Sequence, residues 1–63
     1  MIKIEKNENF KGILNIFVCG CLFDQVKTRA KAIRIASKLA VERKELGFSF
    51  LGFPMVQGEN EKD

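Results

Sequence analysis

The chain has 63 residues, 11 of them basic and 8 acidic, with no histidine and a hydrophobic content of 46%. This length allows one small domain, and the hydrophobic content excludes a disordered chain. Two cysteines without histidine cannot complete a four-ligand zinc or iron–sulfur site within one chain, so we expect no metal and no cofactor. The net charge of +3 is small, so only its distribution along the chain can indicate a partner.

The two longest uncharged segments, residues 12–23 and 46–58, are both too short to cross a bilayer as a helix. An alternative is a secretion signal with basic residues before position 12 and a lipidation site at Cys21. Two acidic residues, Glu5 and Glu8, interrupt that basic region, and the apolar part is very short, so we expect a cytoplasmic protein instead.

Residues 1–6 predict a first strand with one solvent-exposed face, because Ile2 and Ile4 alternate with charged side chains. A polar turn follows over residues 7–12. Residues 13–23 predict a second strand, which is rich in β-branched and aromatic residues and apolar on both faces. Gly20 in its middle indicates a bulge, a bend or a close backbone approach.

Cys19 and Cys21 are two residues apart, so on a strand both thiols would point to one face. Bridging the two would be strained, and no helix N-terminus is predicted beside them to activate a thiol. We favour buried structural thiols. A metal shared between subunits or a redox role is the alternative.

Residues 28–46 predict an amphipathic helix. Thr28 is the expected N-cap, with Asp24 as its competitor, and Gly47 is the expected left-handed residue after the helix. At about 100° per residue, one broad apolar side gathers Ala32, Ile35, Ala36, Leu39, Ala40 and Leu46, with Ile33 at its edge.

Residues 48–56 predict a third strand, which Pro54 either ends or places at a sheet edge. Residues 57–63 are polar and predict a frayed tail, so the expected domain covers residues 1–56.

The predicted fold class is α+β with the order ββαβ: a three-stranded sheet with one helix on one face. Pairing of the third strand beside the second would be parallel, and pairing beside the first would be antiparallel. One helix covers one face of such a sheet, so we expect a dimer formed through the other face. The expected interface residues are Ile13, Phe17, Cys19, Cys21, Phe50 and Phe53.

Basic residues follow the expected exposed side of the helix at Lys27, Lys31, Arg34 and Lys38, with Arg29 nearby. Cations in the first half of a helix oppose its dipole, so they are not there for helix stability. They can bind an acidic protein surface or nucleic-acid phosphates, and the alternative is a solvated surface. No aromatic residue is interleaved with them for base stacking.

Few residues of the chain suit catalysis, since histidine and tyrosine are absent and the glycines form no phosphate-binding loop. We therefore expect a protein that is not an enzyme.

The helix pattern, carried by Thr28, Ala32, Ile33, Ala36, Leu39 and Ala40 between a hairpin and a hydrophobic strand, resembles that of small ββαβ domains from bacteria and phages. The size and composition are also similar to those of phage accessory proteins, including anti-defence inhibitors. This resemblance implies a location in the host cytoplasm and transfers no site residues. The first hypothesis is a homodimeric interaction protein that binds and modulates, or inhibits, another protein. The second is a nucleic-acid-binding module that uses the basic helix surface.

Overall fold

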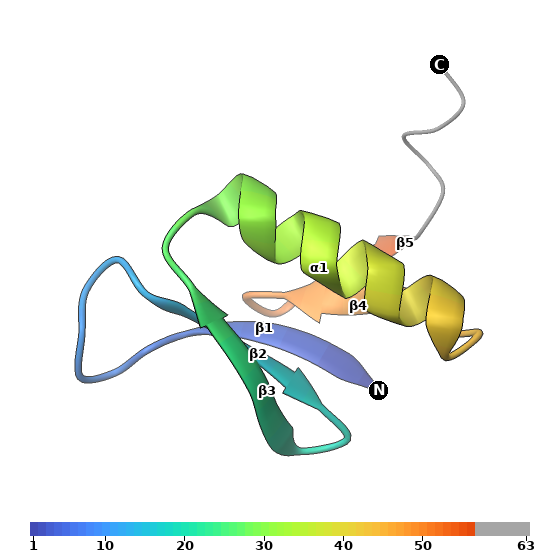
Figure 1. Ribbon diagram of the computed structural model, residues 1–63, viewed down its shortest axis with the longest axis horizontal. Helices are drawn as coiled ribbons and strands as arrows, with labels where there is room; N and C mark the ends of the chain where they lie inside the picture. The colour runs from blue at the N-terminus through green and yellow to red at the C-terminus, as the bar shows by residue number, and fades with distance from the viewer. Residues whose placement is uncertain (57–63) are drawn as a thin grey trace.

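The computed structural model describes residues 1–56 as a five-stranded sheet with one helix packed on it (Figure 1). The strands are β1 (Ile2–Lys6), β2 (Leu14–Val18), β3 (Cys21–Val26), β4 (Gly47–Phe50) and β5 (Phe53–Val56), and the helix is α1 (Arg29–Glu42). A sheet with one helix was predicted, and this α+β class is confirmed. The prediction of three strands is wrong. The predicted tail over residues 57–63 lies outside the described residues.

The first additional turn divides the predicted second strand at Cys19 and Gly20. Both residues have positive φ angles, 53° and 84°, and the flanking residues Val18 and Cys21 pair across the hairpin. Positive φ at both central residues is the geometry of a type I′ turn, whose twist matches that of the strands on either side. Gly20 therefore marks a chain reversal and not a bend within one strand.

A second turn of the same kind divides the predicted third strand. Leu51 and Gly52 have φ angles of 50° and 90°, and Phe50 pairs with Phe53 across the turn. The resulting strand β5 forms one edge of the sheet, where Pro54 needs no outward backbone donor.

The strand order is β3-β2-β1-β4-β5, which places β1 at the centre. Strand β4 pairs beside β1 and is parallel to it. The sequence predicted an antiparallel pairing at this position, and that prediction is wrong. The physical reason is the turn at Cys19-Gly20, which adds one reversal of the chain before the helix. Strand β3 therefore runs in the same direction as β1, and the crossover through α1 returns the chain as β4 in that direction too.

Helix α1 begins as predicted but ends earlier. The Thr28 hydroxyl accepts a hydrogen bond from the Lys31 backbone N–H at 3.2 Å, which confirms Thr28 as the N-cap. The last helical residue is Glu42, so Leu46 and Gly47 lie outside the helix. The predicted role of Gly47 as the left-handed residue is wrong.

The left-handed residue after the helix is Lys44, with a φ of 57°. Its N–H donates to the Val41 carbonyl oxygen at 3.1 Å. The Glu45 N–H donates to the Ala40 carbonyl oxygen at 2.8 Å. These two bonds form a Schellman motif, which satisfies carbonyl groups that the helix end would otherwise leave unpaired.

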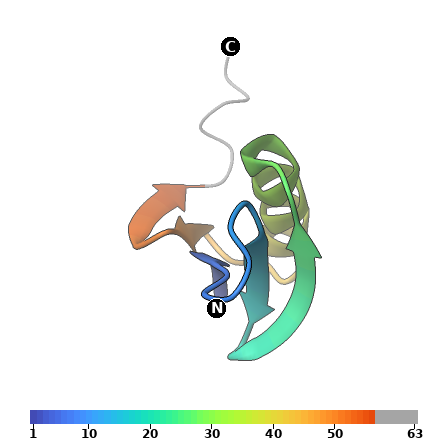
Figure 2. The ribbon, with the colours of Figure 1, turned by 90° about the vertical axis from the view of Figure 1, so that its left-hand side faces the viewer.

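The core lies between α1 and one face of the sheet, as the side view in Figure 2 shows. Three alanines on one side of the helix have no exposed surface, and their small side chains let the helix approach the sheet closely. The predicted apolar side of the helix is thereby confirmed, except for Leu46. The buried core residues are Ile2, Ile4, Ile16, Val26, Ala32, Ala36, Ala40, Phe48 and Phe50.

The opposite face of the sheet is not covered by the helix and is mixed in character. Its central strand presents Lys3 and Glu5, because Ile2 and Ile4 point to the core. Phe17 pairs opposite Lys3 and is half-buried. We expected an apolar second face, and the two charged residues at its centre are a departure from that expectation.

Candidate binding surface on helix α1

The five cationic residues predicted as a binding surface are all exposed. Lys31, Arg34 and Lys38 lie within about 60° of one another around the helix axis, on the side away from the sheet. Lys27 precedes the N-cap and extends this group beyond the helix end. We call Lys27, Lys31, Arg34 and Lys38 the basic helix surface.

Arg29 belongs to a different side of the helix. Its guanidinium carbon lies 5.1 Å from the centre of the Phe50 ring, within the distance of a cation–π contact. The arginine therefore covers a core phenylalanine at the end of β4. The structure separates Arg29 from the other four cations, although the sequence grouped them together.

Two charges of the basic helix surface, those of Lys27 and Lys31, lie at the helix N-terminus and oppose the helix dipole. The first turn of α1 contains no acidic residue. Within residues 1–56, none of the four cations forms an ion pair. Each exposed cation near a helix N-terminus costs about 0.3–1 kcal/mol at low ionic strength. Lys27 and Lys31 thus lower the stability of the helix, and all four cations are free to bind an anion.

A small apolar cleft lies beside this surface, between α1 and the edge strand β3. It has a volume of about 290 Å³ and is lined by Phe23, Ile35 and Leu39, with Lys38 at its rim. Asp24 and Glu42 also line it. Phe23 is 54% exposed because the β3 strand bulges there. This arrangement places an exposed aromatic ring and two aliphatic side chains next to Lys38.

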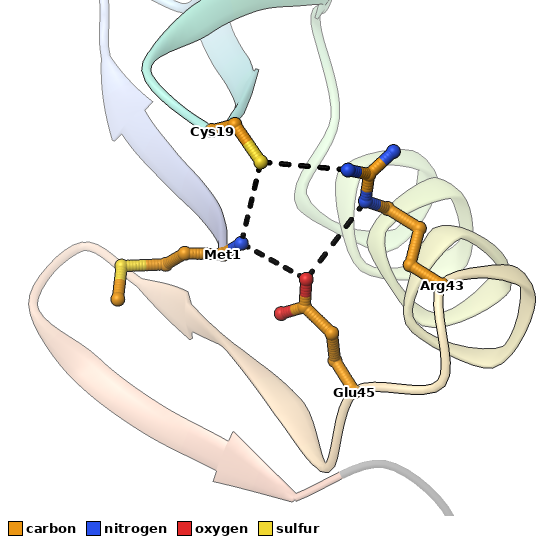
Figure 3. Close-up of polar contacts among 4 residues, drawn as sticks. All are labelled: Met1, Cys19, Arg43 and Glu45. Atoms are coloured by element: carbon orange, nitrogen blue, oxygen red, sulfur yellow. Dashed lines mark hydrogen bonds and ion pairs between the residues drawn. The ribbon is translucent and has the colours of Figure 1, made fainter.

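Cys19 and Cys21 are both exposed, so the prediction of buried thiols is wrong. The Cys19 thiol lies at the β2–β3 turn, where it accepts a hydrogen bond from Arg43 Nη2 at 3.4 Å (Figure 3). The Met1 α-amino group lies 3.7 Å from the same sulfur and 2.9 Å from Glu45 Oε2. This polar cluster joins the chain start, the turn and the segment after α1.

Glu45 controls the ionisation of the Met1 α-amino group. Its hydrogen bond to the amine raises the pKa of that group above the ordinary value of 8.0, and the neighbouring Cys19 acts in the same direction. Partial loss of hydration opposes this change but does not reverse it.

The six residues predicted as a dimer interface do not lie on one surface. Phe17 is half-buried on the uncovered face, whereas Phe50 is in the core beneath α1 with 6% of its surface exposed. Phe53, opposite Phe50, is 71% exposed. Ile13 is half-buried in the β1–β2 loop. The two cysteines flank Gly20 at the β2–β3 turn.

Two groups of residues were missed by the sequence interpretation. Lys6 and Lys11 lie near Lys27 around one surface cavity, although they are distant from it in sequence. Phe10 in the β1–β2 loop is 66% exposed beside Lys11, so exposed aromatic rings do accompany the cations. Pairing of β1 with β2 and of β2 with β3 brings the three lysines together, and their sequence spacing gives no signal of this. Phe10 and Lys11, in contrast, are consecutive in the sequence.

Residues 1–56 contain no cluster of three or more His, Cys, Asp or Glu side chains able to hold a metal ion. Among the same residues, no helix is long and apolar enough to span a membrane. Comparison of the chain with protein families, with curated proteins and with solved structures found no match.

Proposed function

We propose that this chain is a non-catalytic interaction module that binds an acidic surface of another protein through Lys31, Arg34 and Lys38. The observation that carries the proposal is the gathering of these exposed cations on one side of the helix without ion pairs among the described residues, with Lys31 placed against the helix dipole in the first turn. A surface that costs stability and has no internal counter-charge is suited to an external anionic partner.

The cleft between α1 and β3 favours a protein as that partner. Its Phe23, Ile35 and Leu39 side chains offer an apolar contact beside Lys38. Protein interfaces combine a desolvated apolar anchor with surrounding charges. We expect the partner to insert an apolar side chain into the cleft and to direct its carboxylates toward Lys31 and Arg34.

Modulation of the partner follows from coverage of its acidic surface. A small domain bound there blocks other cationic ligands of the partner. An inhibitor of the phage anti-defence type, acting in the host cytoplasm, is the form of this function that the sequence resemblance implies.

Affinity purification from the native or host lysate, with and without nuclease, tests the proposal. Arg34→Glu reverses one charge of the basic helix surface, and Lys44→Glu makes the same change outside it. We expect a nuclease-resistant partner that the original chain and the Lys44 variant retain and the Arg34 variant loses. Equal retention by both variants, or loss of the partner on nuclease treatment, would contradict a protein partner at this surface.

Nucleic-acid binding is the second candidate function, and the exposed Phe10 and Phe23 rings favour it. Each ring lies near a lysine, Lys11 or Lys38, so base stacking can accompany phosphate contact. The affinity for labelled single-stranded DNA or RNA should then fall steeply with salt. Arg34→Ala should reduce the slope of log K against log salt by about 0.7, the value for one phosphate contact. Unchanged mobility of both nucleic acids at low salt would exclude this function.

We also propose that two copies associate through the uncovered face of the sheet. Lys3 and Glu5 lie two residues apart on its central strand, so a two-fold axis between them brings each lysine opposite the glutamate of the other copy. Phe17, Leu22 and Val56 supply apolar surface around these charges.

Light scattering at micromolar concentration tests the association. Lys3→Glu should give a monomer by placing like charges together, and the double exchange of Lys3→Glu with Glu5→Lys should restore the dimer. A monomeric original chain would end the proposal. So would a double variant that stays monomeric while Lys3→Glu alone dimerises.

A further inference from the structure

A surface cavity of about 420 Å³ lies at the end of the sheet next to the start of α1, and three lysines line it. Lys6 is the last residue of β1, Lys11 lies in the β1–β2 loop, and Lys27 lies in the connection from β3 to α1. Figure 1 shows this loop and this connection at the same end of the molecule.

The register of the sheet brings the three lysines together. Lys6 pairs with Leu14, and Leu14 pairs in turn with Val26, the residue before Lys27. The ends of three adjacent strands therefore meet at this cavity. Lys11 reaches it from the loop that joins β1 to β2.

Hydrogen bonds hold the β1–β2 loop in shape. The Asn7 side-chain oxygen accepts from the backbone N–H groups of Asn9 and Phe10 at 2.8 and 3.0 Å. The Asn7 side-chain nitrogen donates to Asn15 Oδ1 at 3.2 Å. The Asn7 backbone N–H donates to the Ile13 carbonyl oxygen at 3.0 Å. This bracing fixes the backbone that carries Lys11, so a ligand need not order the loop on binding.

The cavity concentrates positive charge without compensation. No aspartate or glutamate is among the described residues that line it. Within residues 1–56, none of Lys6, Lys11 and Lys27 forms an ion pair. Three ammonium groups around one cavity repel one another, and an anion bound between them removes that repulsion.

We propose that this cavity binds a phosphate group. A phosphate monoester carries about 1.5 to 2 negative charges at pH 7 and three acceptor oxygens, so it can receive a hydrogen bond from each of three lysines. A carboxylate carries one charge and matches the site less well. Ile13 and Leu14 also line the cavity and offer an aliphatic wall to an organic body attached to the phosphate. The cavity volume lies within the range of small-ligand sites.

Titration of the 63-residue chain with pyrophosphate at constant ionic strength, followed by amide NMR, tests the proposal. We expect saturable shifts at residues 6–14 and at Lys27. Lys6→Gln and Lys11→Gln should each weaken binding about fivefold, because a partly exposed charge-assisted hydrogen bond is lost. Lys44→Gln removes the same charge at a distance from the cavity and should change the affinity less than about twofold.

Two results would overturn the proposal. One is the absence of saturable shifts at pyrophosphate concentrations up to about 10 mM, a limit that corresponds to negligible affinity. The other is an equal loss of affinity in the Lys11 and Lys44 variants, which would show attraction to net charge alone.

Inorganic phosphate and AMP distinguish the two sources of the phosphate group, and saturable binding of either supports the site. AMP that binds about tenfold more tightly identifies a phosphate ester whose organic part contacts Ile13 and Leu14. Equal affinity identifies a free phosphate anion. Arg34→Glu should leave phosphate binding within about twofold, and Lys11→Gln should leave capture of a protein partner unchanged, so failure here is separable from failure of the proposed function.

Discussion

The α-amino group of Met1 and the carboxylate of Glu45 form an ion pair of 2.9 Å between residues separated by 44 positions. The pair fastens the start of the central strand β1 to the segment that leads from α1 into β4 (Figure 3). Arg43 Nε lies 3.8 Å from the same carboxylate oxygen, so Glu45 forms ion pairs with two cationic groups. A single glutamate therefore joins the two parallel central strands at one end of the sheet.

This ion pair predicts a loss of stability at alkaline pH. The folded pKa of the Met1 amine is raised above 8.0, so its contribution to stability is complete below pH 8 and is lost as the pH rises through the folded pKa. Glu45→Gln removes the main cause of the raised pKa. The unfolding midpoint of the original chain should fall more steeply above pH 8 than that of the variant.

Other groups also titrate in this range, so the difference between the two proteins is the quantity to measure. Glu42→Gln, a variant at a glutamate outside the ion pair, should follow the pH profile of the original chain. Parallel profiles for the original chain and the Glu45 variant would show that the ion pair does not contribute.

The left-handed backbone conformation of Lys44 predicts that glycine at this position would stabilise the fold. Its φ of 57° is left-handed, a conformation that costs a residue with a Cβ about 1–2 kcal/mol. Lys44→Gly removes this cost but increases the freedom of the unfolded chain, so we expect a net gain of about 0.5–1 kcal/mol in the free energy of unfolding. Urea denaturation measures it. Lys44→Ala keeps the Cβ and removes the charge, so a gain of equal size in that variant would show that backbone conformation is not the cause.

At Gly47, in contrast, glycine is required because a methyl group cannot be accommodated. A Cβ at this position would collide with the carbonyl oxygen of Met55 on the adjacent strand β5. Gly47→Ala should therefore separate β4 from β5 and lower the free energy of unfolding by about 1–3 kcal/mol. Gly52→Ala is the comparison, because a Cβ there meets no atom and only its φ of 90° is unfavourable. An unchanged free energy of unfolding in Gly47→Ala would contradict a collision at this position.

The helix and its cap could be predicted from the sequence because both depend on local signals. Thr28 and the alanine spacing specify where α1 begins and which side is buried. The end of α1 could not be predicted, because a lysine occupies the left-handed position where glycine is usual.

The two additional hairpins could not be predicted because their strands are apolar on both sides of each turn. Type I′ turns favour Asn or Asp before Gly, and this chain has Cys19 and Leu51 there. A continuous apolar segment therefore looks like one long strand. The basic helix surface was predictable from its spacing, whereas the lysine cavity depends on the sheet register between Lys6 and Val26.

Lys31 allows a test of whether the basic helix surface serves binding at the expense of stability. It is the third residue of α1, and its N–H already donates to the Thr28 hydroxyl. Lys31→Glu would complete a capping box with Thr28 and place a negative charge in the first turn. We expect the free energy of unfolding to rise by about 0.5–1 kcal/mol while capture of the acidic partner falls.

Lys31→Gln separates the two effects, because glutamine completes the capping box without adding a negative charge. Its stability should lie between those of the original chain and Lys31→Glu, and its binding should weaken less. Thermal unfolding and partner capture are measured on the same three proteins. A loss of stability in Lys31→Glu would show that the cation contributes to the fold. Unchanged capture would show that Lys31 is not part of the binding surface.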